Sequence, residues 1–118
     1  MTPITDKNGN TVAYLYNNVL VDTSMQNVMG VILGNCIFGD SPSPLGKFFN
    51  NVFRGTNGKV VAMAENTEKP VQDMVKVNIL DGAWKILKKV KDHVCGWVPE
   101  IAEWSETSLP EFLKAKAA

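Results

Sequence analysis

The chain has 118 residues, 45% of them hydrophobic, and its 12 basic and 12 acidic side chains give a formal net charge of zero. This length corresponds to one ordinary domain, and the hydrophobic content argues against general disorder. A neutral chain exerts no overall attraction on nucleic acid or on an anionic membrane. We therefore expect no nucleic-acid partner, although Lys85, Lys88, Lys89 and Lys91 form a basic stripe.

The N-terminal segment and the cysteines bear on location. The first ten residues, MTPITDKNGN, lack the basic start and apolar run of a secretory signal peptide. No stretch approaches the roughly 18 consecutive apolar residues of a membrane-spanning helix. Cys36 and Cys95 lie in different regions, and a disulfide framework normally has more cysteines. We expect free thiols, no membrane span and a cytoplasmic protein.

A short pattern repeats through the first half. Residues 12–22, 29–39 and 45–55 each have a small second residue, apolar fourth and ninth residues, and a turn pair at positions six and seven. These pairs are Asn17-Asn18, Gly34-Asn35 and Asn50-Asn51. Asn and Gly best tolerate the positive φ angles of a two-residue type I′ turn. Each stretch is therefore predicted to form a β-hairpin.

Counting outward from each turn gives the register of the hairpins. Two apolar residues oppose each other on one face of each hairpin: Leu15/Leu20, Ile32/Ile37 and Phe48/Phe53. Small residues lie beside these pairs, namely Ala13, Gly30 and Gly46. A single hairpin is marginal in water, so we expect the apolar faces to meet around a shared axis. The small residues would then lie where the hairpins approach most closely.

The fourth unit is incomplete in chain order. Residues 61–64 supply a first strand, but no return strand follows. Ile4 precedes Ala13 by nine residues, as Phe53 precedes Ala62. We therefore predict that residues 2–6 pair with residues 60–65 and close a ring, which removes exposed sheet edges.

The opposite faces of the hairpins differ in polarity. The third hairpin carries Lys47 and Arg54 there, whereas the first two are apolar. Because a solvated face should be polar, we expect the first two to be covered by the second half of the chain or by another subunit. The predicted interaction surface consists of Tyr14, Tyr16, Val31, Leu33, Phe38 and Trp84.

The second half has a different periodicity. Apolar residues recur at threes and fours from Val71 to Val94, which predicts an amphipathic helix over 83–94 and favours its extension over 70–80. Residues 75–79 also alternate like a strand, and Asp81-Gly82 is typical of a turn. The capping box from Ser108 to Glu111 predicts a short helix over 109–116.

No residue pattern points to catalysis. His93 lies two residues from Cys95, a spacing at which helical side chains diverge, and a zinc site needs three or four ligands. We expect no enzyme, catalytic residue, metal or cofactor. Trp84, Trp97 and Trp104 either line a ligand pocket or pack against the ring.

In each hairpin a small residue is followed two positions later by an apolar residue, and two positions after that by a turn pair of Asn or Gly. Hairpins of this form resemble those of the 4-fold beta flower family of bacterial proteins, and the resemblance covers residues 2–66. Residues 104–113, WSETSLPEFL, are similar to that family's Trp/Ser-rich terminus, which ends in Glu-Phe-Leu. The resemblance implies a fold and transfers no activity or catalytic residue.

These patterns predict an α+β protein. A closed four-fold ring of short antiparallel β-hairpins occupies residues 1–66, and a helical region with an acidic, aromatic tail occupies residues 67–118. We expect a non-catalytic structural or protein-interaction module that self-associates as a homodimer or other homo-oligomer, or binds another protein. The alternative is a small-ligand or cell-envelope-binding module with an aromatic pocket between ring and helix.

Ring closure makes the first strand essential to the whole first half. Deleting residues 1–6 is expected to lower the melting temperature strongly, because the fourth hairpin loses one strand and the sheet gains two free edges. Circular dichroism melting of the shortened chain measures this, and an unchanged transition would contradict the closure.

Overall fold

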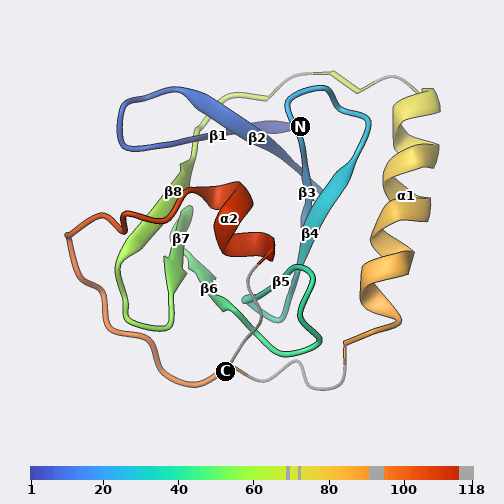
Figure 1. The fold of residues 1–118 in the computed structure, drawn as a ribbon. Coiled ribbons are helices and arrows are strands. Elements are labelled where there is room, and N and C mark those ends of the chain that lie inside the picture. Colours follow the sequence, from blue (N-terminus) through green and yellow to red (C-terminus); the bar gives the residue numbers. More distant parts are fainter. Residues whose placement is uncertain (69, 72, 91–94, 115–118) are drawn as a thin grey trace.

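The computed structural model describes residues 1–68, 70–71, 73–90 and 95–114. Eight antiparallel strands close into a barrel in which spatial order follows chain order, and two short helices accompany it (Figure 1). The strands are β1 (Thr2–Thr5), β2 (Thr11–Tyr16), β3 (Val19–Val21), β4 (Val28–Leu33), β5 (Cys36–Phe38), β6 (Gly46–Phe49), β7 (Val52–Gly55) and β8 (Val60–Ala64). The helices are α1 (Asp73–Leu87) and α2 (Leu109–Lys114).

The predicted hairpin turns and their register are confirmed. Both residues of each turn pair have positive φ, for example 46° at Asn17 and 64° at Asn18, as a type I′ turn requires. The apolar pairs oppose each other as counted from the turns: Leu15/Leu20, Ile32/Ile37 and Phe48/Phe53. Local turn chemistry therefore determines which residues face inward.

The barrel closes between the two ends of the strand region, as predicted. β1 pairs with β2 on one side and with β8 on the other, where Ile4 lies opposite Ala64 and Thr5 opposite Met63. The Glu65 amide N–H also donates to the Pro3 carbonyl oxygen at 2.9 Å. This closure leaves the sheet without a free edge.

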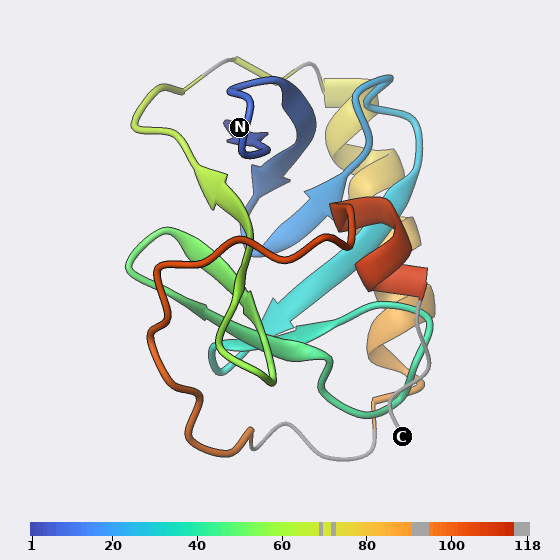
Figure 2. The ribbon, with the colours of Figure 1, turned by 60° about the vertical axis from the view of Figure 1, so that its left-hand side comes forward.

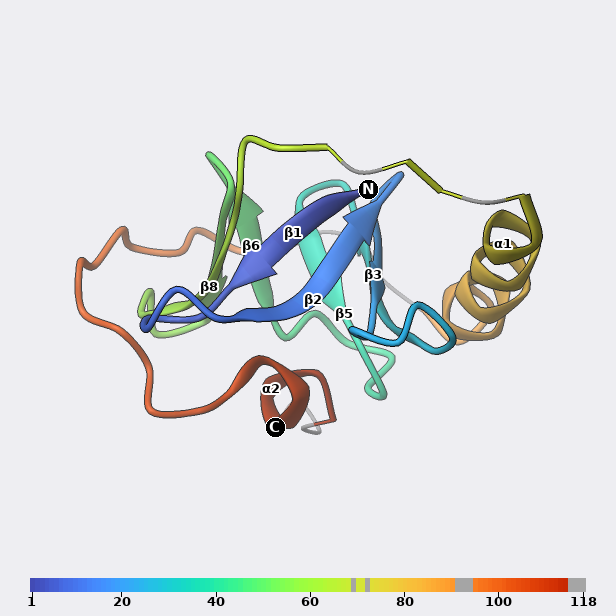
Figure 3. The ribbon, with the colours of Figure 1, turned by 90° about the horizontal axis from the view of Figure 1, so that it is seen from above.

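The inside of the barrel holds the main core, and α2 covers one end of it (Figures 1 and 3). Leu109 and Leu113 of α2 are buried among barrel residues that include Ile4, Leu20 and Phe53. The predicted capping box starts this helix: the Ser108 Oγ accepts the Glu111 N–H at 3.4 Å and its hydroxyl donates to Glu111 Oε1 at 3.1 Å. The predicted last residues, 115 and 116, lie outside the described part of the chain.

α1 packs on the outside of the barrel beside β3 and β4 (Figure 3). Its residues Ile79 and Ala83 are buried in a second core with Val21, Val31 and Phe38 of the strands. The helix thus supplies the predicted cover from within the same chain. Of the predicted interaction surface, Val31 and Phe38 are buried in this second core, and Tyr14, Tyr16 and Leu33 are half-buried against it.

The helix also resolves the ambiguity between residues 70 and 82. Residues 75–79 are helical rather than extended, and the expected turn at Asp81-Gly82 lies inside α1. Gly82 serves close packing instead, because an added Cβ would lie 2.6 Å from Val28 Cγ2. The helix ends at Leu87, before the predicted residue 94; residues 91–94 lie outside the described residues.

Residues 95–108 cross the outside of the barrel to reach α2 (Figure 2). Trp104 bridges to Val60 of β8, the Ser105 N–H donates to the Val60 carbonyl at 2.8 Å, and Lys59 pairs with Glu103 at 2.8 Å. This segment therefore forms part of the outer wall. Neither helix in the described chain has the length and apolarity needed to cross a bilayer.

The small residues inside the barrel allow close strand approach, and Gly46 tests this. A Cβ there would overlap the Arg54 carbonyl oxygen, whereas a Cβ at exposed Gly96 would meet nothing within 4 Å. We expect Gly46→Ala to lower the free energy of unfolding by about 1–3 kcal/mol. Gly96→Ala should change it by less than about 0.5 kcal/mol. Urea denaturation measures both, and equal effects would contradict the packing argument.

Candidate interaction surface and ligand pocket

The outer face of α1 carries an apolar stripe. Val77, Leu80 and Trp84 are 66%, 69% and 66% exposed. Their spacing of three and four residues places them on one helix face, turned away from Ile79 and Ala83, which pack on the barrel. We call Val77, Leu80 and Trp84 the helix stripe. Of the predicted interaction surface, Trp84 alone belongs to it.

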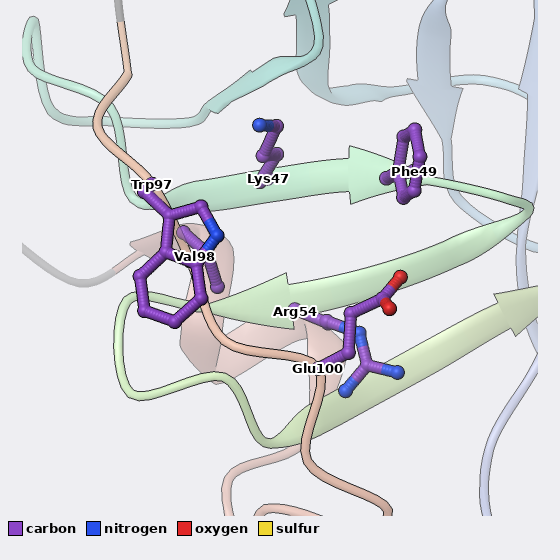
Figure 4. A pocket seen from close by; sticks show the side chains of 6 residues that line it. All are labelled: Lys47, Phe49, Arg54, Trp97, Val98 and Glu100. Atoms are coloured by element: carbon purple, nitrogen blue, oxygen red, sulfur yellow. The ribbon is translucent and has the colours of Figure 1, made fainter.

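A pocket of about 310 Å³ lies on the outer face of β6 and β7, which α1 does not cover (Figure 4). The hairpin supplies one wall, and the segment after α1 supplies the other. Its lining residues are Lys47, Phe49, Arg54, Trp97, Val98 and Glu100. We call this the β6–β7 pocket. It occupies the outer face of the third hairpin, which carries Lys47 and Arg54 where the first two hairpins are apolar.

Arg54 fastens the two walls of this pocket together. Its Nη1 donates to the Gly58 carbonyl oxygen at 2.7 Å and to the Ile101 carbonyl oxygen at 2.5 Å. These bonds join β7 to the C-terminal segment and satisfy two backbone acceptors with a charged donor. Arg54 therefore shapes the pocket and contributes positive charge to it.

Lys47 lies directly across the ladder from Arg54. In Figure 4 its ammonium group is turned away from Arg54 and Glu100, and it stands between Trp97 and Phe49 along β6. No carboxylate among the described residues lies within ion-pair distance of the ammonium nitrogen. The pocket thus presents, besides the bonded Arg54 guanidinium, a lysine side chain placed between two aromatic residues along the face of β6.

The three tryptophans do not meet in a shared site. Trp97 is 84% exposed and lines the β6–β7 pocket, while Trp104 lines a separate groove of about 150 Å³ beside β8 and α2. Trp84 lies on the helix stripe. The predicted pocket built from all three between ring and helix is therefore replaced by a pocket with Trp97 alone.

The structure brings the two cysteines into contact as a pair of reduced thiols. Cys36 is buried in the core beneath α1, and Cys95 packs against that core. Burial is the main cause that raises the pKa of Cys36 to about 12, and its hydrogen bond with the Cys95 thiol acts in the same direction. Sequence reasoning missed this contact because the intervening helix determines where Cys95 returns to the barrel.

Among the described residues, His, Cys, Asp and Glu side chains form no cluster of three that would hold an ion. His93, considered above beside Cys95, lies outside the described residues.

A family model described as 4-fold beta flower protein matches residues 2–113. The chain belongs to the 4-fold beta flower family. The match spans the barrel, α1, the crossing segment and most of α2, so it also includes the residues between 66 and 104 that lie outside the two stretches of sequence resemblance. No curated protein and no solved structure matches this beta flower chain.

The two thiols should differ in reactivity. The raised pKa of Cys36 leaves very little of its thiol ionised at pH 8, and the thiolate is the reactive form. We expect iodoacetamide to alkylate half-buried Cys95 at least about a hundredfold faster than buried Cys36 in the native protein. Peptide mass mapping over time measures both rates. In denaturant the rates should converge, and equal native rates would contradict the assigned burial.

Proposed function

We propose that this beta flower protein is a non-catalytic interaction module that forms a homodimer through the helix stripe. The observation that carries the proposal is the exposure of Val77, Leu80 and Trp84 on a helix whose other face is held against the barrel. Single exposed apolar residues are ordinary, but a contiguous apolar patch with polar borders is typical of an interface.

The spacing of the stripe favours a second copy of the chain as the partner. Val77 lies three residues before Leu80, and Trp84 lies four residues after it. Two antiparallel α1 helices related by a two-fold axis near Leu80 would place the two Leu80 side chains together. Each Val77 would then pack beside the Trp84 of the other copy. Such an isologous contact needs only one self-complementary patch.

Charge and size agree with a reversible dimer. The chain has no net charge, and Asp81 and Lys85 beside the stripe already pair with each other at 3.5 Å. Two copies therefore meet without strong repulsion. A helix of 15 residues is about 22 Å long and offers less than the roughly 800 Å² per partner of a standard interface. We accordingly expect dissociation constants in the micromolar range, with Trp84 as the main anchor.

Two finer statements belong to the same proposal. We interpret the barrel as a four-fold ring of hairpins, with β8 and β1 forming the fourth unit, which the pairing of these strands supports. We also propose a cytoplasmic protein, a location that the two reduced thiols support.

A second candidate function is small-ligand binding. The β6–β7 pocket favours it, because the pocket combines charged groups with exposed aromatic rings. This site is separate from the helix stripe, so both functions are compatible in one chain.

The homodimer is tested by sedimentation equilibrium of the wild type, Leu80→Glu and Asn78→Glu at up to about 100 µM protein. The wild type and the Asn78 variant should approach twice the 13.0 kDa monomer mass. Leu80→Glu should stay monomeric, because a charge would enter the centre of the apolar contact.

Asn78 is the matched control, since it is exposed on the same helix but lies about 100° from Val77 around the helix axis. At protein concentrations well below the dissociation constant, where the wild type is also monomeric, both variants should keep the wild-type melting temperature, because neither side chain is buried in the monomer. A wild type that remains monomeric at the highest concentration would overturn the proposal, as would dimerisation of Leu80→Glu.

A further inference from the structure

The β6–β7 pocket combines features that select one class of ligand. Its volume of about 310 Å³ is at the lower end of small-molecule sites and suits a molecule of one or two rings. It is lined by β6, β7 and the crossing segment (Figure 4), and α1 packs instead beside β3 and β4. A ligand could therefore enter without displacing a helix.

Aromatic surface is available on both sides of the pocket. Phe49 is 47% exposed on β6, and Trp97 is 84% exposed on the crossing segment. Ring systems of this size prefer to pack against another aromatic or apolar group. Covering them with a planar ligand would remove apolar surface from water, which favours binding.

Lys47 supplies the charge that would orient such a ligand. Its side chain lies between Trp97 and Phe49 along β6, and no carboxylate of the described residues lies within ion-pair distance of its ammonium nitrogen. Arg54, opposite Lys47 in the ladder, adds a second positive charge while its Nη1 is bonded to two carbonyl oxygens. Lys47 is therefore the group able to form a new charge-assisted hydrogen bond.

Glu100 restricts the charge that a ligand can carry in this pocket. Its carboxylate lines the same pocket below Lys47 in Figure 4 and would repel a second negative charge placed near it. A ligand with one acidic group at one end of an otherwise neutral ring system satisfies all of these residues.

We propose that the β6–β7 pocket binds a planar aromatic monoanion, with its acidic group on the Lys47 ammonium and its rings against Trp97 and Phe49. This proposal does not depend on dimerisation, because Lys47, Phe49 and Trp97 lie outside the helix stripe.

The test uses ¹H–¹⁵N correlation NMR of the full chain, titrated with 2-naphthoate. Each tryptophan contributes one indole N–H signal. We expect saturable shifts of the Trp97 signal with an apparent Kd on the order of 0.1–1 mM, and little change at Trp84 or Trp104. The neutral isostere 2-naphthamide and the non-aromatic anion cyclohexanecarboxylate should each bind at least about tenfold more weakly.

Matched variants identify the side chains that contribute to the affinity for 2-naphthoate. Lys47→Gln keeps a polar side chain, one atom shorter, but removes its charge, and Trp97→Ala removes the more exposed ring. Each should weaken 2-naphthoate binding by about tenfold. Trp84→Ala, which removes an exposed tryptophan of the helix stripe, should leave the affinity unchanged.

Several results would overturn the proposal. Equal affinity for 2-naphthoate and 2-naphthamide would mean that Lys47 does not bind the acidic group of the ligand. Loss of binding in Trp84→Ala but not in Trp97→Ala would place the ligand on the helix stripe. Absence of saturable shifts up to about 10 mM ligand would show that the pocket does not bind planar aromatic monoanions.

Discussion

The pairing of β1 with β8 is the constraint on which the rest of the structure depends. β1 also pairs with β2 and buries Ile4, so one short strand joins the beginning of the barrel to its end. Closure sets the distance across the barrel, and Gly30 and Gly46 allow the neighbouring strands to meet at that distance. The interior that remains accepts Leu109 and Leu113 of α2. Without the closed ring, α2 would have no enclosed core to cover.

The helix stripe and the β6–β7 pocket both follow from one difference between the repeated hairpins, the polarity of their outer faces. The first two hairpins carry apolar residues on their outer faces, and α1 buries these faces by packing Ile79 and Ala83 against them. The third hairpin carries Lys47 and Arg54 at the corresponding places, so an apolar helix face gains nothing by covering it. The helix therefore stops short of β6 and β7 and leaves a pocket there. Its own outer face keeps the helix stripe exposed, because the barrel occupies only one side of it.

The barrel was predictable from the sequence because its determinants are local. Turn pairs such as Asn17-Asn18 set the register by their positive φ angles, and the nine-residue spacing before Ala13 indicated the closing strand. The candidate site was less predictable, because it depends on contacts between distant segments. The sequence pattern of residues 75–79 fits either a strand or a helix. They form a helix because α1 packs on β4, with Gly82 against Val28. No spacing in the sequence indicated that Trp97, rather than Trp84 or Trp104, would reach Lys47.

The position of Trp97 is determined by its neighbours rather than by its own burial. Before it, Cys95 packs against the core that contains Cys36; after it, the Ile101 carbonyl is held by Arg54. Cys36 and Arg54 both lie opposite Lys47, on the two strands that flank β6. The crossing segment is therefore attached to the barrel on either side of Lys47, and residues 96–100 must span the face between these attachments. A side chain that is 84% exposed keeps a defined place beside the pocket because the backbone on both sides is anchored.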